Sequence, residues 1–285
     1  MQRVLFLRPD KAGDALKSLP ALRAIRALRP GDEFHILASK HNSSVFEYEP
    51  GFKVSLSPKG LPPFDKLINL LCEPADVTLK LFKEIAAPQK YSFEGSATYR
   101  DEVANISGVI ERAFGTKLSL ENAAPVLSSE DHKEAGEKMG IKSGRWLGIC
   151  PIAGNSHRTH SQRRWKSFIK FITSRRSFDR YFLFGGPTDL SSLEQLRTHN
   201  VEIFLPSSFR TLGAYMKRLD GVVAIDSGPL HLARSLEVPT LGILNGGDFL
   251  RWFPGKGHLV KRGFLHGQPG LFQMLVGYGG WLHSL

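Results

Sequence analysis

The stretch from residue 4 to residue 38, VLFLRPDKAGDALKSLPALRAIRALRPGDEFHILA, decides the fold. Its apolar run at residues 4–7 is typical of a buried parallel strand. Leucine and isoleucine then recur at helical spacing from Leu16 to Leu28, and a second apolar run at residues 34–38 follows the Pro30-Gly31 break. Strand, helix and strand in this order form a βαβ unit, so the sequence predicts an α/β protein with a parallel sheet.

Pro20 interrupts the helical pattern. Because proline has no backbone N–H to donate within a helix, we expect either a kink at Pro20 or a helix that starts close to it.

A second series of alternating elements begins at residue 146. We expect strands at residues 146–150, 181–184, 201–204, 221–225 and 240–244, with helices around residues 165–174, 189–198, 208–219 and 229–236. Between the two series, residues 66–71 are predicted as a strand and residues 98–115 as a helix. The polar stretch at residues 121–144 separates them. We therefore predict two α/β domains, residues 1–142 and 143–285, with ligands held at the carboxyl ends of the strands in a cleft between the domains.

Composition narrows the function classes. The 285 residues are 41% hydrophobic and 23% charged, which is typical of packed domains. A net charge of +11 suits an anionic partner such as a nucleotide, a nucleic acid or an anionic membrane surface. Only two cysteines occur, Cys72 and Cys150, which excludes a disulfide framework and a cysteine-rich zinc module and favours a reducing compartment.

No apolar run in the sequence reaches the length of a transmembrane helix, and the first apolar run is too short for a signal peptide. We therefore expect a cytoplasmic protein. Several catalytic signatures are also missing from the sequence: G-x-G-x-x-G after a strand, a complete P-loop, H-E-x-x-H and C-x-x-C. Their absence weighs against a dehydrogenase, an NTPase and a zinc hydrolase.

The segment Asp226-Ser227-Gly228-Pro229-Leu230-His231 is the sharpest local signal. It follows a predicted buried strand and opens a helix, where backbone N–H groups attract an anion and Gly228 lets a phosphate approach closely. The alternative is that Asp226 and Ser227 only cap the helix, and local sequence weighs the two equally. His231 has its own alternative as an ordinary core-facing histidine.

A second candidate loop follows the strand at residues 146–150. It contains Gly154, Asn155 and Ser156 and leads into a basic run that includes Arg163. Amide, hydroxyl and guanidinium groups of this kind suit a diphosphate. A solvated basic loop is the alternative, and the small turn after the strand favours the functional interpretation.

Gly13 and Asp14 lie where the first strand meets its helix, close to Lys11. A carboxylate at this place can take a proton from a hydroxyl group. Taken alone, however, Asp14 is better explained as an acidic residue favoured by the helix dipole.

Together these segments resemble glycosyltransferase family nine, the ADP-heptose:lipopolysaccharide heptosyltransferases. The first strand, Gly13-Asp14 and Leu19-Pro20-Ala21-Leu22 are similar to the family's N-terminal motif. Residues 226–233 and 238–243 are similar to its D-[ST]-G-x-x-H-x-x-A segment and the strand after it. Residues 151–165 are similar to its P-G-A…K-x-W loop, although Arg163 stands where the family has lysine and Lys166 where it has proline.

The resemblance implies a GT-B fold of two Rossmann-like domains and transfer with inversion, without a metal ion or other cofactor. It implies that Asp14 is the general base, with Gly13 and Lys11 on the acceptor side. Carried over by position, the donor contacts are Gly154, Asn155, Ser156, Arg163, Asp189, Asp226, Ser227, Gly228 and His231. The implied partners are a nucleotide sugar, namely ADP-heptose, a lipopolysaccharide core or lipid A acceptor, and the inner face of the bacterial inner membrane.

Three hypotheses stay open at this point. The first is a heptosyltransferase, or a transferase for another nucleotide sugar. The second, motivated by Arg163 and Lys166, is a non-catalytic nucleotide-sugar-binding protein that keeps the fold. The third, a nucleic-acid binder, rests on net charge alone; the sequence has no clustered basic helix and no aromatic RNA-binding motif, so we expect no nucleic-acid partner.

Overall fold

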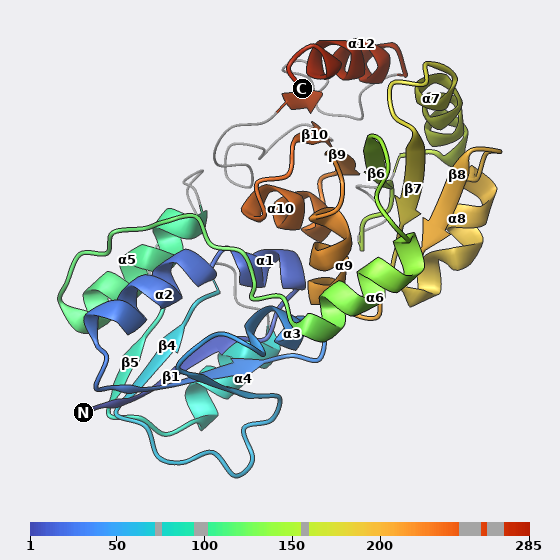
Figure 1. The fold of residues 1–285 in the computed structure, drawn as a ribbon. Helices are drawn as coiled ribbons and strands as arrows, with labels where there is room; N and C mark the ends of the chain where they lie inside the picture. Colours follow the sequence, from blue (N-terminus) through green and yellow to red (C-terminus); the bar gives the residue numbers. More distant parts are fainter. Residues whose placement is uncertain (72–75, 94–101, 155–159, 245–257, 261–270) are drawn as a thin grey trace. The chain divides into compact units, whose positions relative to one another are not determined.

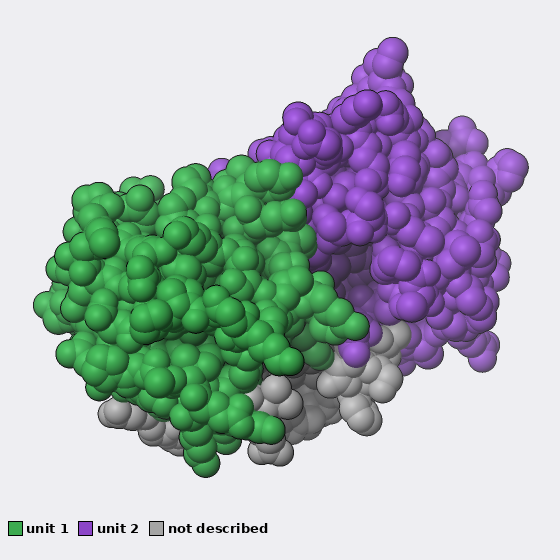
Figure 2. All heavy atoms as spheres, turned by 90° about the horizontal axis from the view of Figure 1, so that it is seen from below, with its two compact units in different colours: residues 1–126, 250–254 green, residues 127–249, 255–285 purple. Residues whose placement is uncertain are grey.

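The computed structural model describes residues 1–71, 76–93, 102–154, 160–244, 258–260 and 271–285. The described chain divides into two compact units, coloured separately in Figure 2. Unit 1 contains residues 1–126, and unit 2 contains the described residues from 127 onward.

Unit 1 is built on a five-stranded sheet with the order β3-β2-β1-β4-β5 (Figure 1). All of its strand pairs are parallel. Its elements are β1 (Arg3–Arg8), α1 (Ala12–Leu16), α2 (Leu19–Leu28), β2 (Glu33–Ala38), α3 (Ser43–Phe46), β3 (Phe52–Ser55), β4 (Lys66–Asn69), α4 (Asp76–Glu84), β5 (Gln89–Tyr91) and α5 (Glu102–Phe114). The strand order reverses between β1 and β4.

Alternate side chains of β1 serve opposite faces of this sheet. Leu5 and Leu7 pack with Leu67 in a cluster that takes in apolar residues of α4. Phe6 points the other way, where its ring stacks on Phe34 at 5.8 Å. Figure 1 shows α2 and α5 together on one side of the sheet and α4 on the other. Burial on both faces explains why β1 reads as a continuous apolar run.

Unit 2 has a six-stranded sheet with the order β11-β10-β9-β6-β7-β8, again with only parallel pairs. Its elements are α6 (Ser129–Met139), β6 (Trp146–Cys150), α7 (Gln162–Ser174), β7 (Arg180–Phe184), the 3₁₀ turn η2 (Pro187–Asp189), α8 (Leu190–Leu196), β8 (Val201–Phe204), α9 (Phe209–Met216), β9 (Gly221–Ile225), α10 (Gly228–Ser235), β10 (Thr240–Ile243), β11 (His258–Val260) and α12 (Leu271–Leu282). The order reverses between β6 and β9, as it does between β1 and β4 in unit 1.

The two faces of the second sheet are covered by different helices. Leu147 and Ile149 of β6 join a core cluster with buried residues of α7, α8 and α12. On the opposite face Trp146 meets Phe182 at 5.4 Å, and Phe184 packs against Tyr215 of α9 at 5.7 Å. Each unit is therefore a three-layer α/β sandwich of the Rossmann type.

The predicted elements agree closely with these two units. Pro20 lies at the second position of α2, so of the two possibilities for this proline the structure selects the nearby helix start. The sequence reasoning missed the edge strands β3 and β5, the helices α1, α3, α4, α6 and α12, and strand β11.

The predicted domain boundary at residue 142 falls within unit 2, because helix α6 packs on α9. Asp131 of α6 accepts hydrogen bonds from Arg210 Nε at 2.5 Å and from the Thr211 hydroxyl at 2.6 Å. Ser128 and Asp131 form a capping box at the start of this helix.

Candidate functional site

The reversal of strand order marks one place in each sheet where ligands bind in open parallel sheets, outside the carboxyl ends of the two strands concerned. In unit 1 these strands are β1 and β4, and in unit 2 they are β6 and β9. The segments that follow β1, β6 and β9 are the ones that hold most of the predicted site residues.

In unit 2, the turn after β9 leads directly into α10, which begins at Gly228. Ser227 occupies the N-cap position in an extended conformation, but its hydroxyl donates to the Ile225 carbonyl at 3.1 Å instead of accepting from the helix. Pro229 has no N–H and Leu230 N already donates to Ser227 O at 3.0 Å, so the first turn of α10 offers the N–H of Gly228, at the positive end of the helix dipole. Asp226, Ser227, Gly228 and His231 are all half-buried at this helix start. The arrangement is suited to an anion.

The loop after β6 lies beside this turn, because β6 and β9 are paired from Leu147 to Cys150. Gly154 is exposed, and a Cβ added there would meet no atom within 4 Å. Arg163 is exposed in the first turn of α7, whose N-cap Ser161 accepts a hydrogen bond from Arg164 N. The predicted donor residues Asn155 and Ser156 lie outside the described residues.

Asp189 ends the 3₁₀ turn after β7 and has a structural partner there. Its Oδ2 accepts a hydrogen bond from Gly186 N at 2.8 Å. A Cβ on Gly185 would approach the Asp189 Cβ to 2.9 Å, so the turn fits tightly around this aspartate. β7 is the neighbour of β6, which places Asp189 one strand away from the reversal.

The start of α7 also holds a buried imidazole. His160 is 1% exposed, and neither ring nitrogen has a hydrogen-bond partner among the described residues. Burial, together with the charge of Arg164, lowers the pKa of His160 to about 4, so the ring is neutral at pH 7. Its edge packs against Trp165 with the ring centroids 6.3 Å apart. Cys150, at the end of β6, is also buried, and burial raises the pKa of its thiol to about 12.

In unit 1, Asp14 lies in α1, just beyond the end of β1. Its side chain is 29% exposed, and its Oδ1 lies 3.3 Å from Lys17 Nζ. Gly13 is buried beside it, and Lys11 is exposed at the N-cap position of α1. Asp14 N donates to Lys11 O at 3.1 Å, which fixes the tight turn from strand to helix.

Arg8, the last residue of β1, is completely buried beneath Asp14. One terminal nitrogen donates to the Leu70 carbonyl just after β4 at 2.6 Å. The other donates to the Asp14 carbonyl at 2.5 Å and to Glu102 Oε1 at 3.1 Å. Arg8 Nε lies 3.3 Å from Asp10 Oδ1. This arginine therefore joins β1, β4, α1 and α5 at the point where the strand order reverses.

Lys17 and Asp10 complete a network of five charged side chains. Lys17 Nζ lies 3.7 Å from Glu102 Oε2, and burial lowers the pKa of Lys17. Burial, reinforced by the charges of Asp14 and Glu102 and opposed by Arg8, raises the pKa of Asp10 to about 6. For Arg8, burial disfavours the charged form, but the three carboxylates outweigh it and raise the pKa.

Sequence reasoning missed Arg8, Lys17 and Glu102. A signal for Arg8 was present, because a charged residue that directly ends a buried apolar run must find partners when it is buried. Glu102 gave no local signal, since its contacts with Arg8 and Lys17 join segments far apart in the sequence.

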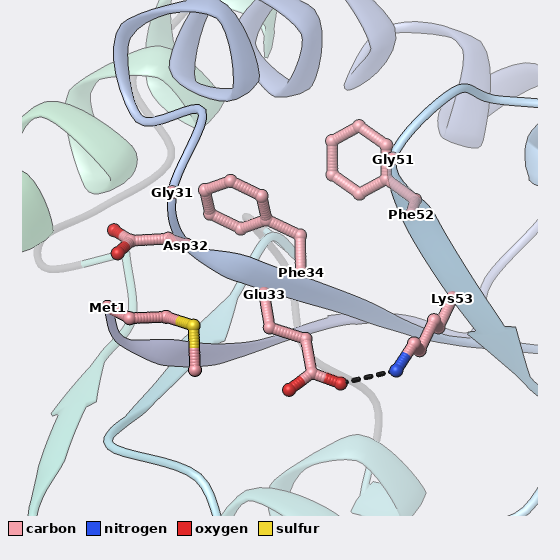
Figure 3. Close-up of a pocket in the computed structure, with 8 residues that line it drawn as sticks. All are labelled: Met1, Gly31, Asp32, Glu33, Phe34, Gly51, Phe52 and Lys53. Carbon is pink, nitrogen blue, oxygen red and sulfur yellow. Dashed lines mark hydrogen bonds and ion pairs between the residues drawn. The ribbon is translucent and has the colours of Figure 1, made fainter.

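A further cavity of about 390 Å³ lies at the opposite edge of the first sheet, by the amino ends of β2 and β3 (Figure 3). Its carboxylates are already paired. Glu33 accepts hydrogen bonds from Lys53 at 2.5 Å and from Arg3 at 2.7 Å. These bonds, the one from Lys53 most of all, lower the pKa of Glu33 to about 2. Asp32 accepts from Gln2 N and Arg29 Nε. We assign no function to this cavity.

Within the described ranges, no group of three or more His, Cys, Asp or Glu side chains is placed to hold a metal ion. None of the helices in those ranges combines the length and apolarity needed to cross a lipid bilayer.

The profile of one family, described as glycosyltransferase family 9 (heptosyltransferase), matches residues 95–257, more than half of the chain. A search of curated proteins found no sequence match.

Solved structures cover almost the whole chain. A glycosyl transferase family 9 protein from Veillonella parvula superposes with a TM-score of 0.82 at 17% identity, over 100% of this chain and 98% of its own. The E. coli heptosyltransferase WaaC, solved with ADP, gives 0.70 at 15% identity, over 98% and 99% of the two chains. E. coli ADP-heptose LPS heptosyltransferase II gives 0.73 at 14% identity, over 99% of both. The chain thus shares the fold of these proteins, with two parallel-sheet α/β units.

Proposed function

The chain belongs to glycosyltransferase family 9 and has its GT-B fold, and from this premise we propose that it transfers a heptose from ADP-heptose to a lipopolysaccharide core acceptor, with inversion and without a metal ion. The observation that carries the proposal is the helix start at Gly228, which lies where the strand order of unit 2 reverses and beside the loop after β6.

The donor site of this proposal lies in unit 2. A diphosphate leaving group gains negative charge as its bond to the sugar breaks, and a helix N-terminus stabilises such charge. Arg163 adds a cation that can form charge-assisted hydrogen bonds to the phosphates. Gly154, Asn155, Ser156, Asp226, Ser227 and His231 complete the proposed donor contacts. Asp189 is proposed to contact the nucleoside through the carboxylate oxygen that does not accept from Gly186 N.

Unit 1 supplies the proposed base, Asp14, with Gly13 and Lys11 on the acceptor side. The acceptor hydroxyl oxygen forms a bond to the anomeric carbon while the bond from that carbon to the diphosphate oxygen breaks. The hydroxyl proton passes to the Asp14 carboxylate, and the bonding electrons leave with ADP. A positioned base of this kind contributes about 10²–10⁴-fold to the rate. A single displacement of this kind inverts the anomeric configuration.

The net charge of +11 supports an anionic acceptor. We propose that the protein works in the cytoplasm of a bacterium, at the inner face of the inner membrane, where anionic lipids attract a basic surface. No nucleic-acid partner is proposed.

Two measurements test the function. Calorimetry with ADP, ADP-heptose and a panel of other nucleotide sugars is expected to show tightest binding of ADP-heptose. A transfer assay on lipopolysaccharide lacking heptose is expected to show turnover in the presence of EDTA. Binding without transfer to any acceptor would favour the non-catalytic alternative, and preference for another donor would assign a different sugar.

A further inference from the structure

Asp14 is held at two points by two cations. Lys17 Nζ lies 3.3 Å from its carboxylate, and Arg8 donates to its backbone carbonyl at 2.5 Å. Both cations contact Glu102 in turn: Arg8 meets Oε1 at 3.1 Å and Lys17 approaches Oε2 to 3.7 Å. The side chains of Arg8, Lys17 and Glu102 are each at most 5% exposed. Glu102 is therefore the junction of the two contacts that fix Asp14.

The position of Glu102 matters because of the charges around Asp14. Lys17 Nζ, 3.3 Å from the carboxylate, attracts it electrostatically and holds it in place. Arg8 and Lys17 are the two cations, and Asp10, Asp14 and Glu102 are the three anions. Asp10 reaches the network through Arg8 Nε at 3.3 Å. Helix α3, which packs on α1, has no charged residue, and neither do residues 69–71 at the end of β4.

We propose that Glu102, at the start of α5, is a positioning residue for the transfer reaction: it anchors Lys17 and Arg8 against Asp14 and takes up positive charge that would otherwise weaken the base. Glu102 touches neither substrate in this scheme and acts only through its two cationic neighbours. The inference rests on the proposed role of Asp14 as the base.

Glu102→Gln tests the charge, because glutamine keeps the size of the side chain and removes its negative charge. We expect kcat to fall about tenfold, since a loosened base is misplaced and also less basic. The acid limb of the kcat–pH profile is expected to move to lower pH by about half to one unit. The KM for the donor is expected to stay within about twofold. Glu102→Asp, which keeps the charge, is expected to restore the acid limb.

Lys17→Met gives a second test of opposite sign. It removes a cation from Asp14, so the acid limb is expected to move to higher pH by about half to one unit. This variant also decides the question if Glu102→Gln does not fold, because an unmoved acid limb in Lys17→Met would overturn the inference.

Glu111→Gln is the matched control. Glu111 lies on the same helix and pairs with Lys117 at 2.9 Å, away from the network. We expect wild-type kcat, KM and pH profile. A Glu102→Gln enzyme that keeps the wild-type profile, or one that loses rate with the acid limb unmoved, would overturn the positioning role, since a merely structural residue leaves the limb in place.

The same assay separates this inference from the proposed function. If Asp14→Asn keeps near-normal turnover, the assignment of the base fails, and the role of Glu102 fails with it. If Asp14→Asn abolishes transfer while Glu102→Gln behaves as wild type, only the positioning role fails.

Discussion

At the carboxyl edge of unit 1, five charged side chains pair with one another, whereas the same edge of unit 2 presents a helix start, a glycine and a half-buried turn. The two sheets reverse their strand order in the same way, so the difference does not come from topology. In unit 1 the charged groups bind mainly one another: Arg8 donates to Glu102 and to the Asp14 carbonyl, and Lys17 pairs with Asp14 and Glu102. In unit 2 the helix start at Gly228 places the positive end of the helix dipole where an anion can bind.

Among the substitutions proposed here, Asp14→Asn is expected to have the largest effect on the rate of transfer. Asparagine keeps the size of the side chain but cannot accept the proton, so transfer should fall by at least about a hundredfold while donor affinity changes little. Initial transfer rates and donor calorimetry check this. Asp10→Asn is the comparison, because Asp10 is a nearby carboxylate that pairs with Arg8 and not with Asp14; its rate should fall far less than that of Asp14→Asn. Equal losses in both variants would mean that Asp14 is not distinguished as the base.

Arg163→Ala tests the charge of unit 2. Loss of a charge-assisted hydrogen bond to the diphosphate should weaken ADP-heptose binding by about 1.5–3 kcal/mol, and Arg163→Lys should recover part of this. Lys170→Ala removes an exposed cation further along the same helix and should leave affinity unchanged. If all three variants bind like the wild type, the loop is only a solvated basic surface.

Gly228→Val tests the helix start itself. A branched side chain at the first position of α10 would occupy the space where a phosphate approaches the amides, so affinity for ADP should fall about tenfold. Gly280→Val in α12 is the matched change in the same unit, since a Cβ there meets no atom within 4 Å. Calorimetry on both folded variants decides; unaltered affinity in Gly228→Val would remove this turn from the donor site.

A further expected effect concerns the stability of unit 1. Burial is the main cause that raises the pKa of Asp10 to about 6. The folded protein therefore holds the Asp10 proton more tightly than the unfolded chain does. The resulting contribution to the free energy of unfolding is present at low pH and is lost as the pH rises through 6. Asparagine resembles the protonated form at every pH. Asp10→Asn should therefore gain about 1–2 kcal/mol over the wild type at pH 7.5 relative to pH 4.5. Urea unfolding of both proteins at the two pH values measures this gain, and a difference independent of pH would contradict it.

Most of the fold could be predicted because the central strands are buried on both faces and read as apolar runs. The missed strands β3 and β5 are short and lie at the edges of their sheet, where the side chains are mostly not buried, so they lack this signal. Helix α6 is polar over most of its length, and its clearest mark is the capping box of Ser128 and Asp131. These elements were missed because their pattern of apolar residues is weak, and not because their conformation is unusual.

The candidate site was predictable only where it is local in sequence. The turn from Asp226 to Gly228 and the Gly13-Asp14 pair follow their strands directly, so position along the chain was sufficient to find them. Glu102 approaches Lys17 and Arg8 only after α5 has packed near β1, and spacing along the sequence cannot reveal such a contact.

The anchoring of α6 has a consequence for dissecting the enzyme. The Asp131–Arg210 pair ties this helix to α9, so a fragment that begins at residue 143 would lose the carboxylate that pairs with Arg210 and would uncover the face of α9 on which α6 packs. A fragment that begins at Leu127 keeps the pair and the capping box. Chimeras that exchange the proposed donor site between relatives should therefore be joined before Ser128, so that α6 stays with unit 2.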